Sequence, residues 1–316
     1  CIELQGYNCL PVGVKNSTEF AIDLYCLTST SDAVIVHYSG YGYAKRGCPK
    51  WLIDGLYQWR AHEKSVPLLT MFHELFASGP PWKSSFWLSS YQQYLMRRLA
   101  TLSNVCLTST ELYAKNLSEH CPEVNLKLST IPIFSTIGEP DVVKPLRSRQ
   151  RRLVIFGRAG TKAPIYQTYK SDLEIICSTL NIEEIYDIGP PAIGRVDMIG
   201  AIPVSHMERC ESPEASRILL DSFAGIIDYP CKRLAKSSVF ASYCAHGMLP
   251  INTSSAAHEV DSLLFERDYL TTFSDFSILS NIDKIEEIAD SAFSWHVKHR
   301  SEFHAALFFN SILETS

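Results

Sequence analysis

The sequence lacks any apolar run approaching the roughly 18 residues of a membrane-spanning helix, so none is predicted. It shows no recognisable signal peptide. Its ten cysteines are dispersed and no two have C-x-x-C spacing, which disfavours a zinc site or a thioredoxin-like motif. Dispersed thiols in a large chain are typical of a reducing compartment, where a buried cysteine acts as a small hydrophobic residue. We therefore expect a cytoplasmic protein without a metal, with the inner face of the membrane as a second location to consider.

The chain also lacks an excess of either charge. Its formal net charge is −5, and 20% of its 316 residues are charged while 46% are hydrophobic. This balance gives no electrostatic case for nucleic acid, so we expect no nucleic-acid partner. The length and apolar content favour two domains over one. Because the chain opens on Cys1 rather than Met, we expect that residues before Cys1, with the first strand of the first domain, are missing from this sequence.

Strand-like apolar runs alternate with helical patterns in the first part of the chain. Residues 33–38 form an apolar run with β-branched side chains, as expected of a buried strand. Residues 85–102 place apolar side chains at helical spacing instead. The other elements predicted here are a helix opened by Pro49, strands at 66–72 and 105–108, and a helix at 111–120. This alternation predicts a parallel sheet covered by helices.

The alternation stops at residues 128–145, which hold three prolines and a glycine, and resumes after a basic run at 147–152. We therefore place a domain boundary there and expect domains at 1–145 and 146–316. The second series comprises strands at 153–156, 182–188, 196–200, 223–229 and 248–251, and helices at 166–180, from Ser212, up to Gly247 and at 281–313. Two such series predict two Rossmann-like domains. Ligands of these folds bind outside the carboxyl ends of the strands, which two domains can bring together across a cleft.

His73 and Glu74 stand at the carboxyl end of a predicted strand, in the stretch LLTMFHELFASGPP. A histidine there is suited to titrate or to donate near neutral pH. The alternative is a polar pair that only holds the following loop. That loop contains Trp82 and is expected to border the cleft. The N-terminal aromatic residues could stack on sugar faces or fill the core: Tyr38, Tyr41, Tyr43, Trp51, Trp82, Phe86 and Trp87.

The stretch FGRAGTK follows the first strand of the second series. Glycines such as Gly160 let backbone amides approach an anion, and Arg158 and Lys162, four residues apart, could clamp a diphosphate. The alternative is a surface loop that carries two cations.

The stretch RLAKSSVFASYCAHG at 233–247 follows another predicted strand. Lys236 and Ser237 stand where a helix is predicted to begin. The free backbone amides near Ser238 and Val239 would therefore point in the same direction as the ammonium of Lys236, at the start of this helix. Small residues in this stretch allow the helix to approach the sheet closely.

The Gly-Arg loop and lysine after residue 153, followed by Ala-His-Gly-x-Leu-Pro-Ile at 245–251, resemble glycosyltransferases of family 4. The segment HELFASGPPWKSSFW is similar to the His-Asp/Glu segment of that family, and the resemblance covers residues 33–315. It implies the GT-B fold, an α/β architecture of two Rossmann-like domains facing a cleft. It further implies an acceptor-side first domain, a nucleotide-sugar-binding second domain and a last helix that crosses back.

The resemblance also implies a function, retaining transfer of a sugar from a nucleotide-sugar donor, as in polysaccharide biosynthesis, without a cofactor. The acceptor would be a sugar, a lipid-linked compound or a small molecule, and contact with a membrane surface stays open. His73 would be catalytic, beside the donor sugar. The substrate-binding residues would be Arg158, Gly160, Lys162, Lys236, Ser237, Ser238 and Val239 around the diphosphate, with Glu74 and Trp82 in the first domain.

The sequence departs from the family at the two glutamates, eight residues apart, that accompany this motif. Leu234 and Ser242 stand in their places. The family's first glycine-rich loop is also absent. Two alternatives to a glycosyltransferase therefore remain: a non-catalytic GT-B-like binding or partner protein, and a GT-B sugar-nucleotide epimerase.

Overall fold

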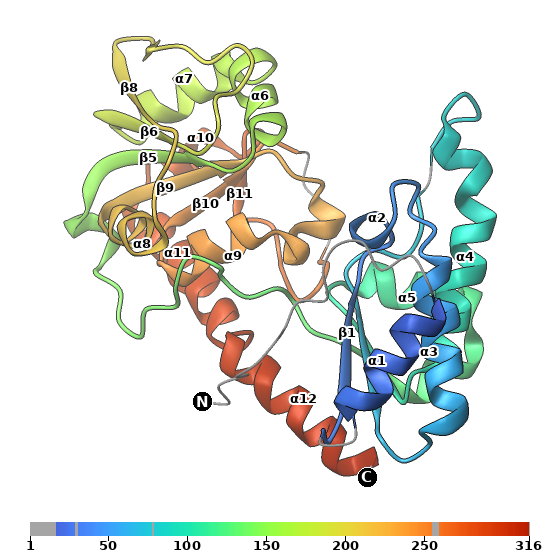
Figure 1. The fold of residues 1–316 in the computed structure, drawn as a ribbon. Coiled ribbons are helices and arrows are strands. Elements are labelled where there is room, and N and C mark those ends of the chain that lie inside the picture. The colour runs from blue at the N-terminus through green and yellow to red at the C-terminus, as the bar shows by residue number, and fades with distance from the viewer. Residues whose placement is uncertain (1–16, 29–30, 78, 255–258, 316) are drawn as a thin grey trace. The chain divides into compact units, whose positions relative to one another are not determined.

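The computed structural model describes residues 17–28, 31–77, 79–254 and 259–315, which form two compact units (Figure 1). The first unit comprises the described residues of Cys1–Ile131 and Glu302–Ser316, and the second is Pro132–Ser301. The division falls within the proline-containing segment 128–145. The domain limits expected from the sequence, 1–145 and 146–316, stay a prediction, and the start of the chain lies outside the described residues.

The first unit is a parallel sheet with the strand order β1-β2-β3-β4. Its strands are β1 (Val34–Tyr38), β2 (Leu68–Phe72), β3 (Val105–Thr108) and β4 (Leu128–Thr130). Its helices are α1 (Ser17–Thr28), α2 (Gly40–Tyr43), α3 (Lys50–His62), α4 (Ser84–Leu102), α5 (Glu111–His120), the 3-10 helix η1 (Pro122–Lys127) and α12 (Ser301–Thr315). Leu68 and Phe72 face a core shared with α1, α3, α4 and α5. Met71 points to the opposite face, where Leu307 and Phe308 of α12 pack. Alternate side chains of β2 are therefore buried on both faces of the sheet, which explains its continuous apolar sequence.

The second unit is a seven-stranded sheet with the order β11-β10-β9-β5-β6-β8-β7, parallel except for the β7–β8 pair. Its strands are β5 (Gln150–Phe156), β6 (Glu184–Ile188), β7 (Met198–Ile199), β8 (Ile202–Met207), β9 (Ser222–Ile227), β10 (Leu249–Asn252) and β11 (Leu270–Thr271). Its helices are α6 (Ala159–Gln167), α7 (Lys170–Thr179), α8 (Ser212–Asp221), α9 (Ser238–Ala245), α10 (Phe276–Leu279) and α11 (Ile282–Val297), with the 3-10 helices η2 (Leu146–Ser148) and η3 (Cys231–Lys236). From β5 the chain builds outward through β6 and β8, then returns to build the other side through β9 and β10. The strand order therefore reverses between β5 and β9, as in doubly wound folds.

The structure differs from the sequence prediction in several helices and strands. The helix predicted at 281–313 is two helices, because Glu139 accepts hydrogen bonds from the backbone N–H (3.0 Å) and Oγ (2.6 Å) of Ser301, where α12 begins. The helix predicted at 166–180 is likewise divided, between α6 and α7. The strand predicted at 196–200 is shorter, only β7, because the chain turns at Gly200 (φ 57°) and continues into the antiparallel β8. Neither β8 nor α1 was predicted from the sequence.

No helix among the described residues combines the length and the apolar character that crossing a bilayer requires.

Gly225, in the middle of β9, allows α9 to lie close against the sheet. A Cβ at this position would fall 2.6 Å from ring atom Cδ1 of Tyr243, which is fully buried. Neither the strand backbone nor the buried ring can move away freely. The absence of a side chain at Gly225 therefore sets the distance between α9 and the sheet.

We predict that Gly225→Ala lowers the free energy of unfolding by about 1–3 kcal/mol, because the added methyl group overpacks the ring of Tyr243. Gly42→Ala serves as the control, since its Cβ would lie 3.6 Å from the nearest atom, an ordinary van der Waals distance. Urea unfolding followed by circular dichroism measures both variants. Equal stability of the two variants would contradict the close packing described for α9.

Candidate functional site

The reversal of strand order between β5 and β9 marks the place in the second unit where a doubly wound fold binds its ligand. The two strands are parallel neighbours, so their carboxyl ends lie at the same edge of the sheet. Helix α6 begins after β5, and α9 begins after β9 and η3. The first amides of each helix have no partner within the helix and carry its positive partial charge. Two such helix starts at one edge favour an anion.

The loop before α6 exposes a cation and a glycine. Gly157 has a φ of 138°, which favours glycine, and lets the chain turn sharply out of β5. Arg158 follows as the N-cap residue of α6 with its side chain exposed, and its carbonyl oxygen accepts a 2.9 Å hydrogen bond from Thr161 Oγ1. Apart from its chain neighbours and the backbone of its own helix, no atom of the described residues lies within 4 Å of the position that a Cβ would take at Gly160. The backbone at Gly160 is therefore open to a ligand.

The start of α9 adjoins this loop. Ser237 caps the helix, since its Oγ accepts a 3.2 Å hydrogen bond from the backbone N–H of Phe240. Val239, in the first turn of α9, lies next to Gly157: a Cβ built on Gly157 would lie 3.7 Å from Cγ2 of Val239. Lys236 is half-buried at the end of η3. The residues predicted around a diphosphate, from the 158–160 loop and from 236–239, therefore lie at the same edge of one sheet.

The hydroxyl of Tyr243 ties the two strands and α9 together beneath this edge. It accepts a hydrogen bond from the backbone N–H of Phe156 at 3.0 Å. It lies 3.2 Å from the carbonyl oxygens of Val154 in β5 and Ile226 in β9, to which it can donate. Burial raises the pKa of this hydroxyl, so the donor proton is retained. The position of α9 relative to the loop after β5 is thereby fixed.

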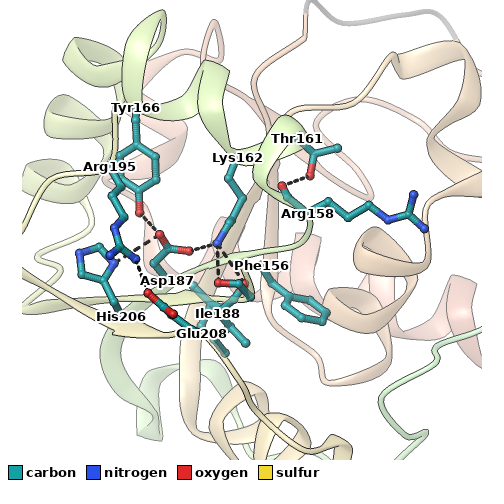
Figure 2. A network of polar contacts seen from close by, with 12 residues as sticks. Phe156, Arg158, Thr161, Lys162, Tyr166, Asp187, Ile188, Arg195, His206 and Glu208 are labelled. Atoms are coloured by element: carbon teal, nitrogen blue, oxygen red, sulfur yellow. Dashed lines mark hydrogen bonds and ion pairs between the residues drawn. The ribbon is translucent and has the colours of Figure 1, made fainter. Parts of the chain in front are cut away.

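Lys162 differs from Arg158 in that its ammonium is buried within the second unit. Its Nζ forms an ion pair with Asp187 of β6 and donates to the carbonyl oxygen of Gly189 at 3.2 Å (Figure 2). The two charged side chains are only 1% and 2% exposed. Figure 2 shows Arg158 pointing away from this cluster. The two predicted clamp residues are therefore not side by side: one ammonium is held inside, and one guanidinium faces outward.

Asp187 is the centre of this buried cluster and was missed by the sequence analysis. Its Oδ2 accepts a 2.8 Å hydrogen bond from Tyr166 and lies 3.4 Å from Nδ1 of His206 (Figure 2). His206 stands directly opposite Asp187 in the β6–β8 register. The feature of the sequence that could have identified it is a carboxylate between Tyr186 and Ile188, near the end of a predicted buried strand, because a buried charge needs a partner.

We predict that Asp187→Leu lowers the free energy of unfolding by about 3–5 kcal/mol, because it leaves the Lys162 ammonium buried without its partner. The double variant Lys162→Met with Asp187→Leu should recover much of this loss, since it removes both charges. Urea unfolding of the single and double variants measures the coupling. Additive losses would contradict a buried ion pair.

In the first unit, His73 and Glu74 directly follow β2. The backbone N–H of His73 donates to the carbonyl oxygen of Tyr38 at 2.9 Å, and Oε2 of Glu74 accepts a 2.8 Å hydrogen bond from Ser39. The Nε2 atom of His73 lies 3.0 Å from Nδ1 of His37, which stands near the end of β1. His37 was not among the site residues predicted from the sequence. The feature of the sequence that could have identified His37 is its position near the carboxyl end of the neighbouring predicted strand.

Trp82, predicted at the border of the site, is 83% exposed in the loop before α4. Trp87 in the first turns of α4 donates from Nε1 to the carbonyl oxygen of Pro81 at 2.8 Å, which holds this loop against the helix. The exposed ring of Trp82 remains available for stacking, and its role stays a prediction.

The two positions at which the family has glutamates are buried in the second unit. Leu234 is 1% exposed and belongs to the core beneath α9. Ser242 is fully buried, and its Oγ donates to the carbonyl oxygen of Ser238 at 2.7 Å and lies 3.1 Å from Oγ of Ser135. Neither position therefore presents a carboxylate or an exposed polar group to a sugar. Within the described ranges, no three histidine, cysteine or acidic side chains are grouped as metal ligands.

Comparisons with known proteins identify the fold. The sequence matches no family model, and a search of curated proteins found no match. Among solved structures, an α-glucosyltransferase in complex with UDP-glucose and DNA containing an abasic site is 11% identical, with a TM-score of 0.57, over 95% of this chain and 84% of that one. "Trehalose-6-phosphate from E. coli bound with UDP-2-fluoro glucose" is 12% identical, with a TM-score of 0.58, over 94% of this chain and 76% of that one. A chain of the GtfA/B complex is 13% identical, with a TM-score of 0.55, over 93% of this chain and 59% of that one. The chain has the GT-B fold of glycosyltransferases, as the sequence predicted.

The expectation that the chain has no nucleic-acid partner is corrected by the same comparisons. The α-glucosyltransferase with this fold was solved with DNA, both with an abasic site and as a 13-mer containing a modified base. A formal charge of −5 is a sum over the whole chain, whereas nucleic-acid binding depends on where the cations lie. Net charge therefore does not support the exclusion.

Proposed function

We propose that this protein is a retaining glycosyltransferase related to family 4 that takes its sugar from a nucleotide-sugar donor. One observation carries the proposal: two helix starts and an exposed arginine share the edge of the second sheet at which the strand order reverses. The UDP-sugars in the neighbours' crystal structures support the choice of donor.

The donor diphosphate would be bound by charge and by backbone amides. Arg158 supplies an exposed guanidinium, and the first turns of α6 and α9 supply amides near Gly160, Ser238 and Val239. Lys236 adds a second positive charge at the start of α9. Such donors stabilise the negative charge that develops on a departing diphosphate.

Lys162 has a second role in this proposal. Its buried ammonium ties α6 to the end of β6, which holds the first turn of α6 in place. It can bind the diphosphate directly only if it leaves Asp187. The Lys162→Met and Asp187→Leu double variant separates the two roles, since direct binding predicts a loss of UDP affinity in a protein whose fold is retained.

His73 is the proposed catalytic residue, acting on the donor sugar, with Glu74 holding the chain after β2 through Ser39. The imidazole can orient a sugar hydroxyl or transfer a proton near neutral pH.

A second candidate is a non-catalytic protein that binds a nucleotide sugar. The observation that favours it is the burial of Leu234 and Ser242, which leaves no carboxylate at the places where the family has glutamates. Binding of UDP without any consumption of a UDP-sugar would select this candidate.

We predict that Arg158→Ala weakens UDP binding by about 1–3 kcal/mol, or roughly 5- to 150-fold in Kd, because a charge-assisted contact is lost. Arg195→Ala is the matched control, since Arg195 is also exposed in this unit but pairs with Glu208. Isothermal titration calorimetry with UDP measures both. Equal affinities of the two variants would remove Arg158 from the site.

We predict that His73→Ala lowers sugar transfer, or donor hydrolysis without an acceptor, by about 10²–10⁴-fold. UDP affinity should be nearly unchanged, because the proposed diphosphate contacts belong to the second unit. Glu74→Gln should lower stability more than turnover, since its partner is Ser39. Full activity of His73→Ala would exclude this histidine from the reaction.

A further inference from the structure

The two histidines at the carboxyl edge of the first sheet form a directly bonded pair. Strands β1 and β2 are parallel, with Tyr38 opposite Phe72, so His37 and His73 lie at the same edge. Nδ1 of His37 lies 3.0 Å from Nε2 of His73. The rings are nearly parallel, at 18°, with their centroids 5.2 Å apart.

His37 is itself held in place from two directions. The hydroxyl of Tyr43 donates to the backbone carbonyl of His37 at 3.1 Å. The ring of Phe308 in α12 lies against the His37 imidazole, with a centroid distance of 6.2 Å and a tilt of 47°. Protein atoms that partly cover the ring lower its pKa, which favours the neutral imidazole.

A hydrogen bond between two imidazoles couples their tautomers. A neutral imidazole carries one N–H donor and one acceptor nitrogen, and which nitrogen holds the proton is set by the bond that it makes. At 3.0 Å one ring must donate and the other must accept. Two protonated rings would place two donors and two like charges face to face, which is unfavourable.

We propose that His37 is a positioning residue that fixes the ring orientation and the tautomer of His73 for the proposed sugar transfer. The inference rests on the proposed function for its catalytic consequence. His37 acts through His73: their hydrogen bond engages Nε2 of His73 and so determines which nitrogen of that ring carries the proton. A purely structural His37 would instead stabilise the contact between β1 and α12 without affecting the tautomer of His73.

The test uses three variants of the full chain. His37→Phe keeps an aromatic ring against Phe308 but has no nitrogen. His37→Asn places an amide near the position of Nδ1 and can restore the hydrogen bond. His120→Phe is the matched control, since His120 belongs to the same unit and its Nδ1 bonds to a backbone carbonyl, of Asn116. Circular dichroism confirms that each variant is folded.

The first measurement is the ¹⁵N chemical shifts of the His73 ring, assigned by their loss in His73→Ala. We expect one tautomer in the native protein, in His37→Asn and in His120→Phe, and a mixture of tautomers in His37→Phe. An unchanged single tautomer in His37→Phe overturns the proposal.

The second measurement is the consumption of UDP-glucose together with UDP affinity. In His37→Phe, kcat should fall by about tenfold to a hundredfold, as for other orienting bonds to a histidine, with KM and UDP affinity little changed and with partial rescue in His37→Asn. Equal kcat in His37→Phe and His120→Phe overturns the catalytic part. If the native protein neither binds UDP nor consumes UDP-glucose, the proposed function fails, and the tautomer measurement still decides whether His37 positions His73.

Discussion

The hydroxyl of Tyr243 connects the parts of the second unit on which the candidate site depends. From α9 it reaches the backbone of both β5 and β9, where it meets one amide and two carbonyl groups. The ring has room there only because Gly225 carries no side chain. The bond fixes α9 to the strand pair at which the order reverses, and so places the helix start beside Gly157. An anion site built from backbone amides needs such rigidity, because amides cannot move to follow a ligand.

Arg158 and Lys162 show that two cations at the start of one helix can have different environments. The exposed guanidinium of Arg158 is hydrated, so in the proposed function a diphosphate would have to displace water from it. The buried ammonium is neutralised by Asp187, so loss of either partner would leave an uncompensated buried charge. The first turn of α6 is thus held from inside the unit while its outer surface stays open at Gly160.

The fold could be predicted from the sequence, because alternating apolar strands and amphipathic helices leave few architectures. The positions of His73, Arg158 and Lys236 after strands could also be predicted, since each follows a predicted strand. The environment of each side chain could not be predicted from the sequence. In the sequence Arg158 and Lys162 are two similar cations, and only the β5–β6 register, which sets Asp187 beside Ile155, places a carboxylate under Lys162. His37 was missed for the same reason, because its contact with His73 arises from pairing across strands. The break between α11 and α12 depends on Glu139, which is 162 residues before Ser301 in the chain.

The short outermost strands of the second sheet have a consequence for self-association. On one side the sheet ends in β7, which is two residues long, runs antiparallel and pairs with a strand that contains Pro203. On the other side it ends in β11, which is also two residues long. A sheet edge recruits a further chain through a row of unpaired amides and carbonyls, and two residues offer too few to template a strand. Where β7 and β11 form its ends, this sheet thus offers a further chain too little backbone for edge-to-edge pairing.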